Sequence, residues 1–128
     1  MNFAIAALGA FNLVCTGTIT TDGAPPSPNS DYSYTYRIDL DAEKWCEKDC
    51  KTIHKIAAIQ PAQITLEDSH DKDPVLGESK MKAFINRETG RHTVIANSVY
   101  FKRPMTMHWN GQCERAPFSG FPKIETKF

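Results

Sequence analysis

The chain lacks any long apolar run, any net charge and any recognisable catalytic motif. No stretch of about 18 apolar residues is present, so the sequence predicts no membrane span. Fifteen basic and fifteen acidic residues cancel, so no overall field attracts nucleic acid or anionic lipid. Asp68 to Asp71 includes serine, histidine and aspartate, but neighbouring residues cannot converge as a hydrolase triad, and no G-x-S-x-G motif is present. The sequence therefore predicts a protein that is not an enzyme and uses no cofactor.

The length and composition predict one globular domain. A chain of 128 residues leaves no room for two ordinary domains, and we expect residues 1–128 to fold as one. The hydrophobic content of 41% and aromatic content of 10% suffice for a core. Residues 1–10 are apolar and rich in small side chains, but they lack the basic start of an export signal. They are interpreted either as an atypical export signal or as the lead-in to the first strand.

Alternating side chains predict β-strands. From Tyr32 to Leu40, every even position is aromatic or apolar and every odd position is polar, which places all the large side chains on one sheet face. We expect Tyr34, Tyr36, Ile38 and Leu40 to be buried. Residues 11–19 alternate in the same way, and several short strands at close spacing predict an antiparallel meander.

Turn and helix signals complete the predicted fold. Residues 80–95 are typical of a hairpin around Arg87 to Gly90, and Asn110-Gly111 predicts a second hairpin because this pair favours a type I′ turn. Helix formers between Asp41 and Cys50 predict one short helix near residues 41–50. The expected fold is therefore mainly β, a single antiparallel meander forming a small closed or half-open barrel with one short helix.

Four cysteines form an even set with three possible pairings. We favour Cys15 with Cys113, which would join the first and last strands, and Cys46 with Cys50. The alternative is four reduced cysteines buried as small hydrophobic residues. Disulfides would place the protein in the periplasm or outside the cell, whereas reduced cysteines would place it in the cytoplasm.

A zinc site is a further alternative for part of the cysteine set. Cys46, Cys50 and His54 recur every four residues and would line one face of a continuous helix, with His70 or Asp71 as a fourth ligand. A helix long enough to present all three is not indicated by the sequence. We therefore predict no metal site, and we keep a thiol or zinc protein centred on Cys46 and Cys50 as an alternative function.

Four short elements together resemble a loose group of small, uncharacterised bacterial β-rich proteins, often with an export signal. They are C-T-G-T from Cys15, R-I-D-L from Arg37, I-N-R-E-T-G from Ile85 and G-Q-C ending at Cys113. The resemblance covers most of the chain, and each motif is structural in character. It implies a single antiparallel β-domain. It implies no activity and carries over no catalytic residue.

One segment mixes aromatic and basic residues and supplies the candidate binding residues. These are Tyr100, Lys102, Arg103, His108 and Trp109, which belong to residue types enriched at protein interfaces. We expect a non-enzymatic domain that binds another macromolecule, as an inhibitor or accessory factor. The expected partner is another protein rather than nucleic acid, and the oligomeric state is not indicated.

The alternative function is a small hydrophobic-ligand carrier that uses the barrel interior. Tyr32, Tyr34 and Tyr36 share one face of a predicted strand and could line a cavity there. A sizeable apolar cavity beside this row would favour the carrier, and a filled core would exclude it.

Overall fold

A computed structural model describes residues 9–23 and 27–123. The proposed export signal or strand lead-in at residues 1–10 lies outside this part of the chain, except for Gly9 and Ala10. The first described strand begins at Ala10.

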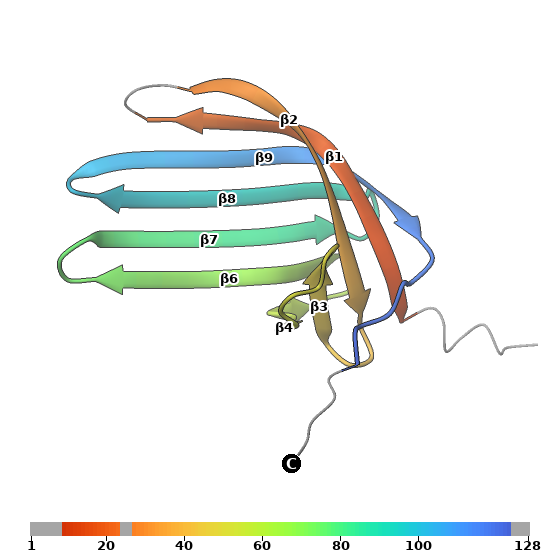
Figure 1. Ribbon diagram of the computed structural model, residues 1–128. Helices are drawn as coiled ribbons and strands as arrows, with labels where there is room; N and C mark the ends of the chain where they lie inside the picture. Colours follow the sequence, from red (N-terminus) through yellow and green to blue (C-terminus); the bar gives the residue numbers. More distant parts are fainter. Residues whose placement is uncertain (1–8, 24–26, 124–128) are drawn as a thin grey trace, which may run out of the picture.

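The described residues form one antiparallel sheet of nine strands (Figure 1). The strands are β1 (Ala10–Asp22), β2 (Ser27–Asp39), β3 (Lys44–Glu47), β4 (His54–Lys55), β5 (Ala58–Ile59), β6 (Gln63–Asp73), β7 (Gly77–Asn86), β8 (Arg91–Tyr100) and β9 (Arg103–Ala116). Their order in the sheet is β4-β3-β2-β1-β9-β8-β7-β6-β5. Pairing of β1 with β9 therefore joins the first and last described strands at the centre of the sheet. The prediction of a mainly β fold is confirmed.

The sheet curls into a half-barrel. In Figure 1, β6 to β9 lie side by side, whereas β1 and β2 bend and cross one end of these strands, where β3 and β4 lie. A bulge in β6 between Thr65 and Glu67 leaves Leu66 without a partner on β7. The Leu66 carbonyl instead accepts a hydrogen bond of 3.0 Å from the indole nitrogen of Trp45 on β3. This bond links strands near opposite edges of the sheet and closes the curl.

The core lies inside this curl. It is a cluster of buried side chains from both halves of the sheet: Phe11, Leu13, Cys15, Tyr36, Ile38, Trp45, Ile56, Ile64, Leu66, Ile85 and Cys113. Tyr36 and Ile38 are buried, as the alternation in β2 predicts, while Tyr34 and Leu40 are half-buried and pack against the cluster. The prediction of a buried row is therefore right in its direction and complete only at the two central positions.

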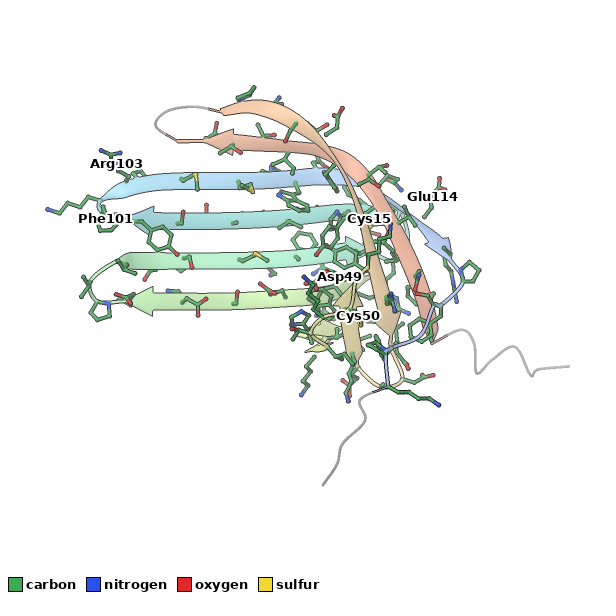
Figure 2. All side chains as sticks on the ribbon, in the orientation of Figure 1. Cys15, Asp49, Cys50, Phe101, Arg103 and Glu114 are labelled. Atoms are coloured by element: carbon green, nitrogen blue, oxygen red, sulfur yellow. A yellow bond between two sulfur atoms is a disulfide. The ribbon has the colours of Figure 1, made fainter. Side chains whose placement is uncertain are left out.

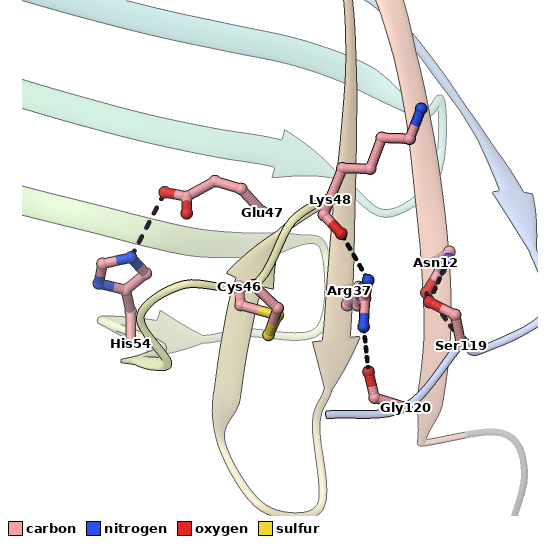
Figure 3. The surroundings of a disulfide bond; sticks show 9 residues. Asn12, Arg37, Cys46, Glu47, Lys48, His54, Ser119 and Gly120 are labelled. Carbon is pink, nitrogen blue, oxygen red and sulfur yellow. Dashed lines mark hydrogen bonds and ion pairs between the residues drawn. A yellow bond between two sulfur atoms is a disulfide. The ribbon is translucent and has the colours of Figure 1, made fainter. Parts of the chain in front are cut away.

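The segment after β9 returns across the sheet and is held there by polar contacts (Figure 3). The Arg37 guanidinium donates to the Gly120 carbonyl at 2.9 Å and also to the Lys48 carbonyl. The Asn12 side-chain amide donates to the Ser119 hydroxyl at 3.0 Å. These bonds fix the end of the described chain against β1 and β2.

The predicted helix at residues 41–50 does not form. Lys44–Glu47 pairs with β2 as strand β3, and Ile38 lies opposite Trp45. Trp45 and Cys46 are both buried, and a helix would remove the indole from the core and from the Leu66 carbonyl. Helix propensity is worth only tenths of a kcal/mol per residue, so the burial of these side chains decides the structure.

The predicted hairpin at Asn110-Gly111 is also wrong. Both residues lie within β9, where Gly111 pairs with Gly17 of β1 on one side and His92 of β8 on the other. Strands on both sides hold β9 extended, so the local turn preference is not expressed. The glycine serves close packing instead, because a Cβ at Gly111 would collide with the Thr16 carbonyl and the Tyr32 hydroxyl.

Two hairpin turns connect β7, β8 and β9. The turn between β7 and β8 lies at residues 87–90, as predicted, and Gly90 has a φ of 78°. The turn between β8 and β9 consists of Phe101 and Lys102, with φ values of 52° and 64°. Two consecutive left-handed residues are what a two-residue hairpin turn requires, and glycine or asparagine usually supplies them. This turn was not predicted from the sequence because neither Phe101 nor Lys102 is a typical residue of such turns.

Candidate functional site

The concave face of the half-barrel contains a cavity of about 140 Å³. Its floor consists of side chains that share one face of β7, β8 and β9. Ala83, Val94 and Trp109 form one row across these strands, and Met81, Ala96 and Met107 form the next. Because both alanines are small, the floor lies low and leaves space above the sheet.

Four aromatic rings form the walls of the cavity: Tyr34, Tyr36, Trp45 and Trp109. Tyr34 contacts Tyr36 edge-on at 4.8 Å between ring centroids and Trp109 at 5.8 Å. Tyr36 meets Trp45 edge-on at 5.6 Å. Edge-to-face contacts of this kind are favourable beyond the burial of area, so each ring holds its neighbour at a fixed inclination.

Two carboxylates complete the lining. Glu47 on β3 and Glu67 on β6 are half-buried and come from strands that only the curl brings together. Burial, together with the charges of Glu47, Asp49 and Glu67, raises the pKa of Tyr34 to about 12. Burial, with the same two glutamates contributing, also raises the pKa of Tyr36. The tyrosine hydroxyls therefore lie in a negative potential.

The two carboxylates have different neighbours. A Glu47 oxygen lies 3.4 Å from Nε2 of His54 (Figure 3), and the His54 ring packs on Trp45 at 4.5 Å between centroids. Glu67 accepts a hydrogen bond of 3.3 Å from the Ser69 hydroxyl. Neither contact involves a lysine or an arginine.

A buried histidine lies behind the aromatic wall. His92 is 0% exposed, with Nδ1 at 2.8 Å from the Tyr32 hydroxyl and Nε2 at 2.7 Å from the Tyr36 hydroxyl. Burial lowers its pKa to about 4, so the imidazole is neutral and has one donor and one acceptor for the two hydroxyls. No motif in the sequence marks His92 as a functional residue. Its signal was the alternation with Val94, which places both on the buried face of β8.

Both predicted disulfides are confirmed. Cys15 and Cys113 lie opposite each other on β1 and β9, with Cα atoms 3.9 Å apart, and the Cα atoms of Cys46 and Cys50 are 5.0 Å apart. No cysteine is free. Two disulfides are compatible with an oxidising compartment.

The cysteines offer no metal site in this state. The sulfur atoms of Cys15 and Cys113 lie within 4.8 Å of a nitrogen of His92. The two sulfurs form a disulfide with each other, however, and both ring nitrogens are hydrogen-bonded to tyrosine hydroxyls. This cluster is therefore packed core. The zinc alternative at Cys46, Cys50 and His54 likewise has no thiolate and no continuous helix.

The predicted binding residues do not form one surface. Tyr100, Lys102 and Arg103 are exposed at the turn between β8 and β9, and Figure 2 shows Arg103 at that end of the sheet, away from Cys15. His108 is exposed on the convex face of β9, and Trp109 faces the concave cavity.

Exposed apolar side chains surround the first three of these residues. Val75 and Leu76, in the neighbouring turn between β6 and β7, are 81% and 48% exposed, and Phe101 is 72% exposed. We call Val75, Leu76, Phe101, Lys102 and Arg103 the hairpin-tip patch. It is apolar with two cationic side chains.

Comparison of the chain with protein-family models, curated proteins and solved structures finds no match. Among the residues that the structure describes, no helix is long and apolar enough to cross a membrane. The resemblance to uncharacterised bacterial β-rich proteins stays a prediction.

Proposed function

We propose that the protein binds a small ligand in the cavity on the concave face, as a carrier rather than as an enzyme. The observation that carries this proposal is the aromatic-walled cavity of about 140 Å³ beside the tyrosine row. An apolar cavity of about 150 Å³ is enough for a ligand of the size of benzene. The two disulfides support a periplasmic or secreted location for this activity.

Filling the cavity tests the proposal. Ala96→Phe would place a ring above the floor, whereas Ile95→Phe, one residue earlier on β8, changes the opposite face of the sheet. Benzene and other small aromatic fragments, detected by NMR, should bind the wild type and Ile95→Phe but not Ala96→Phe. Binding that is unchanged in Ala96→Phe, or absent from the wild type, would overturn the proposal.

A second candidate function is binding of another protein through the hairpin-tip patch. Phe101 and Lys102 occupy left-handed backbone conformations, which cost on the order of 1 kcal/mol for each such residue. A phenylalanine that is both strained and 72% exposed gives the fold nothing that glycine would not give. Together with Lys102 and Arg103, the patch suits a partner surface that is apolar and acidic.

A paired substitution tests this second function. Phe101→Ser removes the most prominent ring of the patch, and Val14→Ser is the matched control because Val14 is 37% exposed on β1, away from the turn. We expect a purified partner protein to bind the wild type and Val14→Ser with similar affinity and to bind Phe101→Ser much more weakly. Equal retention by all three proteins would contradict the role of the patch.

A further inference from the structure

We propose that the ligand of the concave-face cavity is a small organic cation with a head of about the size of trimethylammonium. The inference rests on the proposed function, and it adds the chemical class of the ligand to the place where the ligand binds.

The charge of the lining is the first argument. Among the described residues that line the cavity, the ionisable acids are Glu47 and Glu67, and no lysine or arginine joins them. The nearby Lys51 instead lies 3.8 Å from Asp49. Glu47 contacts the His54 imidazole and Glu67 accepts a hydrogen bond from the Ser69 hydroxyl, so neither carboxylate is paired with a lysine or arginine in these contacts. Partial burial of such a carboxylate is costly, and a ligand that supplies a positive charge would lower that cost.

The aromatic walls are the second argument. A cation is attracted to the face of an aromatic ring within about 6 Å of its centroid, most strongly to tryptophan. The rings of Tyr34 and Tyr36 are inclined by 63°, those of Tyr34 and Trp109 by 78°, and those of Tyr36 and Trp45 by 72°. Since all four rings line the same cavity, these steep angles present ring surfaces to it from different directions. Two tryptophans, two tyrosines and two carboxylates therefore converge on one volume, which is the arrangement that recognises quaternary ammonium groups.

The size and polarity of the cavity favour a small cation over other classes of ligand. A volume of about 140 Å³ holds a compact head group and not a large apolar molecule. An anion would be repelled by both glutamates. A neutral ligand of the same size, such as benzene, should bind more weakly than a cation, because it buries the two carboxylates further without pairing them.

Choline and its neutral carbon analogue, in which a quaternary carbon replaces the nitrogen, form a matched pair of probes. Their affinities for the full chain, measured by calorimetry and by NMR shifts of Trp45 and Trp109, report the contribution of the charge alone. Glu47→Gln and Glu67→Gln remove one charge each with almost no change of shape. Glu88→Gln, in the exposed turn between β7 and β8, is the control, and a thermal melt of each variant verifies that it is folded.

We expect choline to bind at least about tenfold more tightly than its analogue. We expect Glu47→Gln and Glu67→Gln each to weaken choline binding by about tenfold and to leave the affinity for the analogue almost unchanged. Glu88→Gln should change neither affinity. Equal binding of both probes would overturn the cationic class and leave ligand binding in the cavity standing. If neither probe binds, the cationic inference is wrong, and the benzene experiment with Ala96→Phe decides separately whether the cavity binds any ligand.

Discussion

Mild acid should destabilise the fold through one side chain, His92. Its pKa is lowered by burial from an ordinary value of 6.5 to about 4. Below about pH 6.5 the unfolded chain binds a proton at this residue, whereas the folded protein does not until the pH approaches about 4. The stability that the neutral imidazole provides is therefore complete above about pH 6.5 and is lost as the pH falls toward about 4.

The magnitude follows from the separation of the two pKa values. One unit of pKa is worth about 1.4 kcal/mol, so the limiting loss in the free energy of unfolding is about 3 kcal/mol. Between about pH 7.5 and about pH 5 the loss should reach about 2 kcal/mol. Above about pH 5, the lower limit of this window, Asp73 and Glu78 stay ionised and do not contribute to the loss. Hydrogen bonds from the Leu76 and Val75 amides lower the pKa of Asp73, and one from His70 lowers the pKa of Glu78, so both groups titrate in stronger acid.

Urea unfolding followed by tryptophan fluorescence across this window measures the effect. His92→Gln cannot titrate and can still offer a donor and an acceptor to Tyr32 and Tyr36, so its stability should be lower at neutral pH but should change little down to about pH 5. His108→Gln, at an exposed position on the convex face, should keep the pH dependence of the wild type. A wild type that loses no stability in this window, or a His92→Gln variant that loses as much as the wild type, would refute the reasoning.

Three further perturbations test the packing around His92 and the close contact of β1 with β9. Replacing both Cys15 and Cys113 with alanine removes a disulfide between residues 98 apart in the chain and should lower the free energy of unfolding by up to about 4.7 kcal/mol. Replacing both Cys46 and Cys50, which are only 4 residues apart, should lower it by about 2 kcal/mol. Urea titration of the two variants should give this order, and the reverse order would contradict the chain-entropy argument. Gly111→Ala should destabilise the fold by about 1–3 kcal/mol because its Cβ meets the backbone of β1 and a tyrosine hydroxyl, while Gly23→Ala should be nearly neutral because a flexible methionine lies nearest; similar thermal melts for the two would show that no close contact exists at Gly111. Tyr36→Phe leaves a buried imidazole nitrogen without its partner and should lower the free energy of unfolding, measured in urea, by about 1–3 kcal/mol. A variant as stable as the wild type would show that the hydrogen bond between Tyr36 and His92 does not stabilise the core.

The sequence by itself predicted the longer strands β1 and β2, one hairpin and a favoured pairing of the cysteines. The alternation from Tyr32 to Leu40 fixed which side chains of β2 face inward, because successive side chains of any strand point to opposite faces. The pairing of Cys15 with Cys113 followed from placing them in the first and last strands, and the sheet brings those strands together. The strand and the hairpin depend on local patterns that need no knowledge of the fold, whereas the choice among the three cysteine pairings needed the assumption that the first and last strands meet.

Only the tertiary structure decided what the helix formers, the turn signature and the glutamates do. Residues 44–47 form a strand because Trp45 reaches the core and the Leu66 carbonyl, and Asn110-Gly111 stays extended because β9 has a strand on each side. Glu47 and Glu67 read in the sequence as ordinary surface charges. They line one cavity because a bulge at Leu66 and the bend of β1 and β2 bring β3 beside β6. The curl depends on contacts between residues far apart in the chain, and no local pattern encodes such contacts.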